Sequence, residues 1–213
     1  RVLFRSASTS GGSAAIKDDR GLYFINHDGS KAAKPIQIWT QGETESNSHW
    51  LPTIDKPNSR TTIQLELTVP SQYKTLSNGE LISSMDKGYL RTDIWKMDKP
   101  IQVYAIMFAI GDFAVVKDKW RNKEVNYYVE TDYAPYAAKM FQHTPEMIDF
   151  FSKVTGVDYP WNKYSQVVVR DYVSGAMENT SASLFGEFMN QDHREYADAN
   201  HEDVVSHELF HQW

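Results

Sequence analysis

The sequence predicts a mainly β amino-terminal domain over residues 1–131, followed by the first part of an α/β domain over residues 132–213. Three observations support this prediction. Short β-prone segments separated by turn residues follow one another from about residue 20 to residue 130. Apolar residues at helical spacing begin only after Asp132. One more β-prone segment, QVVV at residues 166–169, lies between the helical segments.

The first part shows the alternation of polar and apolar residues that is typical of strands. Residues 61–69 (TTIQLELTV) alternate regularly, so that every second side chain is apolar and faces one side. The tripeptide Ser77-Asn78-Gly79 is a turn signal. We expect further strands at residues 22–25, 36–40, 89–95, 103–110, 113–116 and 125–129. Together these strands predict a β-sandwich or a saddle-like sheet domain.

The second part begins where helix signals appear. Thr144 is expected to cap a helix in which Pro145 takes the first position, and Gly156 is placed to end it. A shorter helix is expected at residues 134–142. The polar stretch 190–200 leads into a last helix from about residue 202. No flexible linker separates the two parts, so we expect them to pack tightly.

Composition excludes several classes of function. The net charge of −6 and the absence of a long basic run argue against nucleic acid as a partner. No window of 18 apolar residues is present, so the sequence predicts no transmembrane helix. There is no cysteine, so a bound metal would have histidine and carboxylate ligands.

Both ends of the sequence indicate a piece of a longer protein. The chain starts RVLFRSAS without an initiating Met, and it stops at HELFHQW within an expected helix. A signal peptide removed from the start stays possible, and the sequence therefore indicates no compartment.

The strongest chemical signal is the motif His207-Glu208-Leu209-Phe210-His211. Four residues make slightly more than one helical turn, so the two imidazoles stand on one face and can bind one zinc ion. Glu208 can then act as the general base on a water molecule that the zinc activates. The alternative is an amphipathic helix that carries two histidines by chance. The motif alone leaves the class of enzyme open.

A second signal is the pentapeptide Gly175-Ala176-Met177-Glu178-Asn179. Its simplest interpretation is a glycine turn beside a sheet edge. A carboxylate near a zinc site has a specific use, however, because it can pair with the free α-ammonium group of a peptide and place the first peptide bond at the metal. Glu178 in that position would indicate an aminopeptidase.

GAMEN followed by HExxH resembles the M1 family of zinc aminopeptidases, the aminopeptidase N group. Most of the chain takes part in the resemblance, which implies a saddle-like β domain followed by the first part of a thermolysin-like α/β zinc peptidase domain. The other segments that are similar to the family are WTQGE at 39–43, WLP at 50–52, LSNG at 76–79, GDF at 111–113 and YPWNKY at 159–164.

The resemblance implies roles for individual residues. His207 and His211 match two ligands of one zinc ion per full-length chain, and Glu208 matches the general base. Glu178 matches the glutamate that binds the amino terminus of the substrate. The third zinc ligand and an oxyanion-stabilising tyrosine match no position here and are expected beyond Trp213, so the isolated chain is expected to bind zinc weakly and to turn over negligibly.

Four further positions are matched by the resemblance. Gly175 and Ala176 match the edge strand that pairs with the substrate backbone. Glu43 matches a residue of the β domain that contacts the same amino group as Glu178. Gln41 is a weaker candidate for lining the site. The other histidines are interpreted as surface or packing residues.

The leading prediction is a zinc-dependent aminopeptidase that acts on peptides with a free amino terminus. One alternative is hydrolysis of a lipid epoxide, known in a branch of the family that has GGMEN, so Ala176 argues mildly against it. Another is a scaffold without chemistry, but such relatives tend to lose the HExxH residues that are intact here.

Overall fold

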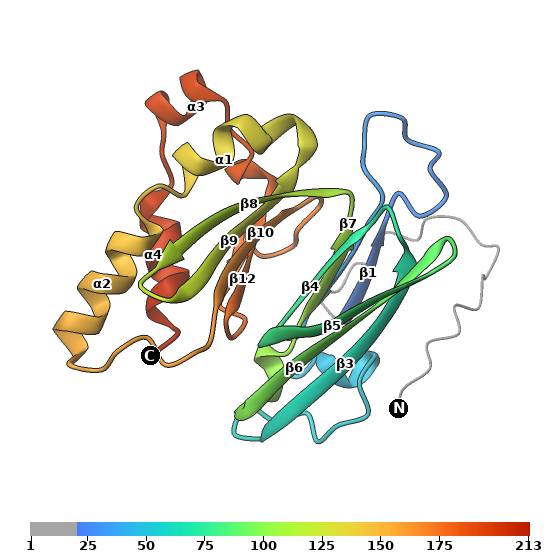
Figure 1. The fold of residues 1–213 in the computed structure, drawn as a ribbon, viewed down its shortest axis with the longest axis horizontal. Helices are drawn as coiled ribbons and strands as arrows, with labels where there is room; N and C mark the ends of the chain where they lie inside the picture. Colours follow the sequence, from blue (N-terminus) through green and yellow to red (C-terminus); the bar gives the residue numbers. More distant parts are fainter. Residues whose placement is uncertain (1–20) are drawn as a thin grey trace.

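The computed structural model describes residues 21–213, in which three sheets are followed and flanked by helices (Figure 1). Residues 1–20, the start of the expected first domain, lie outside the described residues. The first sheet is antiparallel with the order β1-β2-β7-β4. Its strands are β1 (Gly21–Ile25), β2 (Gln37–Gln41), β7 (Phe108–Gly111) and β4 (Lys74–Ser77).

The second sheet is antiparallel with the order β3-β6-β5. Its strands are β3 (Arg60–Pro70), β6 (Leu90–Gln102) and β5 (Glu80–Lys87). The alternation at residues 61–69 is confirmed, because Leu67 and Val69 are buried and Ile63 and Leu65 half-buried, whereas the polar residues at positions 62, 64, 66 and 68 are exposed. The two sheets form the β-rich part of the chain (Figure 1).

The third sheet is mixed and has the order β11-β12-β10-β9-β8. Strands β9, β10 and β12 run parallel, whereas β8 and β11 are antiparallel to their neighbours. The strands are β8 (Phe113–Trp120), β9 (Lys123–Glu130), β10 (Tyr164–Val169), β11 (Ala176–Met177) and β12 (Ala182–Gly186).

Helices cover the outer face of the third sheet (Figure 1). They are α1 (Ala134–Met140), α2 (Thr144–Thr155), α3 (His193–Asp198) and α4 (Glu202–Phe210). Short 3-10 turns complete the chain: η1 (Asn47–His49), η2 (Val103–Ala105), η3 (Thr131–Tyr133) and η4 (Glu187–Met189). None of the helices within residues 21–213 has the length and apolar character that crossing a bilayer requires.

Strand β10 joins the two hydrophobic cores of the molecule. Val168 packs with the helices, whereas Val167 and Val169 point the other way and pack against the β-rich part. Every residue of β10 is buried, as expected for a strand covered on both faces. The two parts of the chain therefore share a core, which agrees with the expected tight packing.

The expected domain boundary between residues 131 and 132 would divide the third sheet between two domains. Strands β8 and β9 precede the boundary, yet β9 pairs with β10, which follows it. The chain passes from the first sheet to the third between Gly111 and Phe113. The division into two domains stays a prediction. A boundary drawn by the pairing of the strands would lie near Asp112.

The prediction of one strand over residues 103–110 is wrong. Residues 103–105 form η2, and β7 begins only at Phe108. Two buried asparagines bind the backbone here in place of a partner strand. Asn47 donates to the carbonyls of Val103 and Ile106, and Asn78 accepts from the amide of Met107.

The expected cap of α2 is also corrected. His143 is the N-cap residue, and the hydroxyl of Thr144 turns inward and donates to Gln166 Oε1 at 2.9 Å. Gly156 does end the helix, with a φ of 71° that favours glycine. The polar stretch 190–200 contains a helix that we did not expect, α3, which begins with a capping box of Asp192 and Glu195.

Candidate active site

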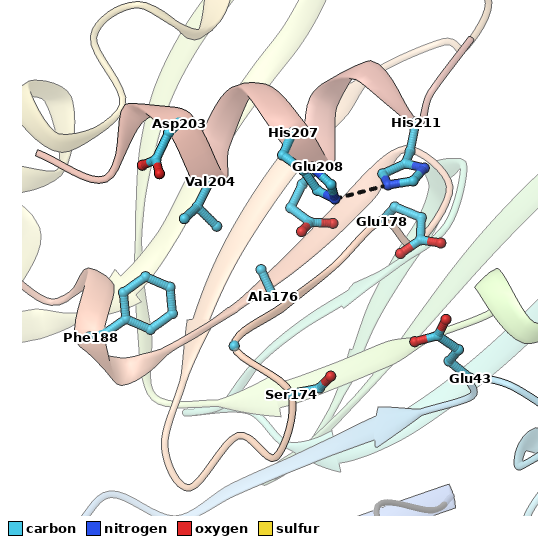
Figure 2. A pocket seen from close by; sticks show the side chains of 11 residues that line it. Glu43, Ser174, Ala176, Glu178, Phe188, Asp203, Val204, His207, Glu208 and His211 are labelled. Atoms are coloured by element: carbon cyan, nitrogen blue, oxygen red, sulfur yellow. Dashed lines mark hydrogen bonds between the residues drawn. The ribbon is translucent and has the colours of Figure 1, made fainter.

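The helix α4 presents the HExxH side chains over a cavity of about 650 Å³ (Figure 2). Val205 and Leu209 are buried in the core and fix the rotation of the helix. His207 and His211 consequently lie together on its open side, and their Nε2 atoms are 3.2 Å apart. The expected pairing of the two imidazoles is thus present in the structure.

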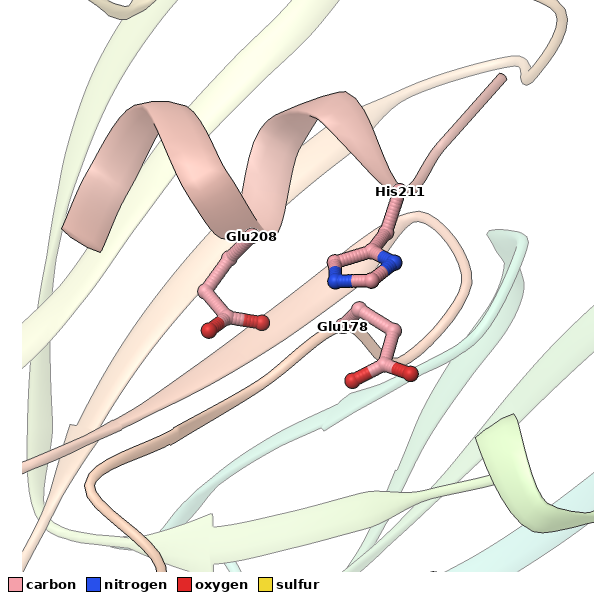
Figure 3. A group of neighbouring side chains, drawn as sticks. All are labelled: Glu178, Glu208 and His211. Atoms are coloured by element: carbon pink, nitrogen blue, oxygen red, sulfur yellow. The ribbon is translucent and has the colours of Figure 1, made fainter. Parts of the chain in front are cut away.

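The donor atoms fit a zinc ion. Two nitrogens bound to one zinc at about 2.0–2.1 Å and at a tetrahedral angle lie about 3.3 Å apart, close to the observed separation of the two imidazoles. Ligand atoms of Glu178, Glu208 and His211 also lie within 4.8 Å of one another (Figure 3). The carboxylates of Glu178 and Glu208 therefore lie beside the histidine pair.

Glu208 is held in a position where its charge is poorly solvated. The residue is 6% exposed, and its Oε2 atom has no hydrogen-bond partner among the described residues. Burial raises the pKa of the Glu208 carboxyl to about 7, and the nearby carboxylates of Glu178 and Glu43 add to the effect. A buried oxygen without a partner is suited to a water molecule or a substrate proton.

Glu178 follows the short strand β11 and points toward His211 and the cavity (Figure 2). Its Oε1 atom accepts a hydrogen bond of 3.1 Å from the hydroxyl of Tyr104 in η2. Burial, with further contributions from Glu178 and Glu43, raises the pKa of Tyr104 to about 12, so the hydroxyl stays protonated as a donor. Tyr104 could not be found from the sequence, because it lies far from both motifs and carries no motif signal of its own.

Gln212 connects the end of α4 to the segment after Glu178. Its Nε2 atom donates to the carbonyl of Glu178 at 3.2 Å, and its Oε1 atom accepts from the amide of Ser181 at 2.7 Å. The side chain is buried. The residue next to His211 thus fixes the histidine relative to Glu178, a role that we did not infer from the sequence.

Gly175 and Ala176 lie at the edge of the third sheet. Ala176 pairs with Phe185 on β12, and the sheet order leaves the other side of β11 without a strand among the described residues. Both residues line the cavity. Gly175 has a φ of 73°, a conformation that a residue with a side chain adopts only with strain.

Of the two residues that the β-rich part was expected to contribute to the site, only Glu43 lines the cavity. Glu43 follows β2, lines the cavity and points toward it from the side opposite α4 (Figure 2). Gln41 does not belong to the lining: it is 2% exposed, as the last residue of β2, where it pairs with Gly21. Its Oε1 atom has no partner among the described residues.

The opposite end of the cavity was not expected to belong to the site. Ser174 lies on the loop before Gly175, and the remaining lining residues come from η4 and the first turn of α4. They are Phe188, Asp203 and Val204. In the sequence, Asp203 has the pattern of an acidic residue that the helix dipole stabilises in a first turn. Its place in the cavity lining became visible only in the structure.

The described residues thus form a β-rich part packed on a mixed sheet, with a histidine-bearing helix above its edge strand. A model of the Peptidase M1 N-terminal domain matches residues 13–104, and a model of the Peptidase family M1 domain matches residues 139–213. The chain belongs to peptidase family M1.

Its relatives include aminopeptidases of distant organisms. The chain is 29% identical to glutamyl aminopeptidase of Homo sapiens over 91% of its own length and 21% of the relative. It is 26% identical to aminopeptidase M1 of Arabidopsis thaliana, over 91% of this chain and 22% of that protein. It is 24% identical to probable aminopeptidase 1 of Sulfurisphaera tokodaii, over 95% of this chain and 25% of that protein. The chain thus spans about a fifth to a quarter of the length of these relatives.

Proposed function

We propose that the protein is a zinc-dependent aminopeptidase, with His207 and His211 as two of the zinc ligands. The observation that carries the proposal is the position of Glu178 and Glu43. Both carboxylates line the cavity beside the histidine pair, at one end of the edge strand β11. Two carboxylates at the end of a peptide-sized groove are suited to bind the ammonium group of a free amino terminus.

The chemistry is divided between the metal and the chain. When bound, zinc polarises the scissile carbonyl and makes a water molecule acidic enough to lose a proton near neutral pH. Glu208 accepts that proton and later delivers it to the leaving amine. The ammonium group pairs with Glu178, and Tyr104 keeps the Glu178 carboxylate in place. The free edge of Gly175 and Ala176 holds the substrate backbone in an extended conformation.

A substitution of Glu208 tests the proton transfer. In the full-length protein, Glu208→Gln should lower kcat for an aminoacyl-anilide by at least about a hundredfold. The zinc content, measured by atomic absorption, should stay near one ion per chain, because the histidines are retained. Normal turnover by this variant would refute the role of Glu208.

A second substitution tests recognition of the amino terminus. Glu178→Gln should raise KM for a peptide with a free amino group by about tenfold or more, because a charged partner is lost. Hydrolysis of the same peptide with an acetylated amino group, slow in both proteins, should change little. Equal losses on both peptides would show that Glu178 does not bind the ammonium group.

A further inference from the structure

The cavity continues past the histidine pair, away from Glu178 and Glu43. Phe188, Val204 and Asp203 form this second end, on the far side of Ala176 in Figure 2. The HExxH motif lies between the two ends, with His207 one helical turn after Asp203. A peptide whose amino terminus lies at Glu178 must extend toward this second end.

The apolar part of the second end is fixed in position. The Phe188 ring packs edge-on against the imidazole of His201, with centroids 5.1 Å apart and planes at 88°. Gly186 allows this arrangement, since a Cβ atom there would lie 3.3 Å from Cδ1 of Phe188 and 3.2 Å from the carbonyl oxygen of Gly175. The ring is still 38% exposed, so it offers apolar surface to a ligand.

The polar part is a single carboxylate. Asp203 is exposed, and the structure shows no ion pair or hydrogen bond of its side chain among residues 21–213. All charged side chains of the lining other than the two histidines are carboxylates: Glu43, Glu178, Asp203 and Glu208. The groove is therefore acidic at both ends, and no Lys or Arg of the described residues lines it.

We infer that this second end receives the side chain of the residue after the cleaved bond and selects lysine or arginine there. The aliphatic stem would lie on Phe188 and Val204, and the cationic group would reach Asp203. The inference rests on the proposed function, because Glu178 and Glu43 define which end of the groove holds the amino terminus. It adds a preference for peptides whose second residue is basic.

A competing interpretation gives Asp203 a purely local role. An aspartate in the first turn of a helix is favoured by the helix dipole wherever the helix lies. This role would leave the preference for the second residue unchanged when the charge is removed. The two interpretations therefore predict different effects of removing the Asp203 charge on the ratio of kcat/KM between peptides with a basic and an uncharged second residue.

The test uses three peptides that share a first residue and differ at the second: lysine, its uncharged analogue norleucine, and glutamate. In the full-length protein we expect kcat/KM for lysine to exceed that for norleucine about two- to fivefold, the range of an exposed ion pair. Glutamate should be poorer than norleucine by a similar factor. In 1 M NaCl, lysine and norleucine should become nearly equal because salt screens the charge.

Substitutions assign the preference to one side chain. Asp203→Asn should bring the ratio of lysine to norleucine close to one, and Asp203→Lys should favour glutamate. Asp198→Asn removes another exposed carboxylate, from α3 outside the cavity, and should keep the wild-type ratio. Calorimetric binding of the three peptides to zinc-stripped protein should show the same order, so one readout does not depend on turnover.

The outcomes separate this inference from the function on which it rests. If no peptide with a free amino terminus is cleaved, the proposed function fails. If such peptides are cleaved but the ratio of lysine to norleucine is one, or is the same in Asp203→Asn as in the wild type, the inference about Asp203 is wrong and the aminopeptidase stands.

Discussion

Tyr104 and Glu178 are 74 residues apart in the sequence, yet they form one hydrogen bond at the end of the cavity that Glu178 and Glu43 line. The tyrosine belongs to the β-rich part and the glutamate to the part that carries the histidines. Burial keeps the Tyr104 hydroxyl protonated, so it can only donate to a carboxylate. A single hydroxyl thus fixes the position of a group that we propose to bind substrate.

Tyr104→Phe should loosen Glu178 without unfolding the protein. We expect KM for a free-amino peptide to rise about three- to tenfold, the range of one ordinary hydrogen bond, because Glu178 stays charged and only its positioning is weakened, while kcat falls less. Steady-state kinetics on the full-length protein measure both values. Tyr73→Phe is a matched control, because Tyr73 lies in the turn between β3 and β4, outside the cavity. A loss confined to kcat would contradict a positioning role.

At the scale of single elements, α4 is anchored at both ends. Near its start, Glu202 accepts hydrogen bonds from His143 at 2.7 Å and from the Tyr196 hydroxyl at 2.6 Å. Just after its end, the Gln212 side chain donates to the carbonyl of Glu178 and accepts from the amide of Ser181. These contacts, with the buried face of the helix, determine where the two histidines stand.

Gln212→Ala should weaken the second anchor. The Ser181 amide would lose its acceptor in a buried place, which should lower the free energy of unfolding by about 1–3 kcal/mol. We also expect weaker zinc binding, measured by competition with a chromogenic chelator, because His211 is the preceding residue. Gln64→Ala on the exposed side of β3 should change neither quantity. Unaltered zinc affinity in Gln212→Ala would show that the anchor does not position His211.

The sequence patterns predicted those elements whose signal is local. Alternation located β3, and the spacing of the two histidines placed them on one side of α4. The capping box of α3 is also a local signal, but the polar composition of residues 190–200 hides the short helix that it begins. The break at residues 103–107 could not be predicted, because it depends on amides of Asn47 and Asn78 that reach it only in the folded chain.

At the scale of the whole molecule, Lys163 lies buried where the two parts meet. Its Nζ atom donates to the carbonyls of Ser77 at 2.9 Å and of Ser181 at 2.8 Å. Burial lowers the pKa of Lys163 to about 7, although Glu124 and Glu80 oppose the shift. A neutral amine still has two N–H groups, enough for both carbonyls.

The lowered pKa predicts a pH dependence of stability. Between about pH 7 and pH 10 the unfolded chain holds a proton on Lys163 that the folded chain lacks, so the unfolding free energy should rise with pH. The slope contributed by this group is at most about 1.4 kcal/mol per pH unit. Denaturant titrations at several pH values measure it. Lys163→Met should remove this contribution, whereas Lys87→Met on the exposed strand β5 should keep it.

The hairpin of β8 and β9 has a practical consequence for shortened forms of the protein. A chain that started at residue 132 would lack this hairpin, and the side of β10 that pairs with β9 would face solvent. Such an open, apolar strand edge recruits a second copy of itself and leads to aggregation. A chain that starts before Phe113 keeps β8 and β9, and β9 still pairs with that edge of β10.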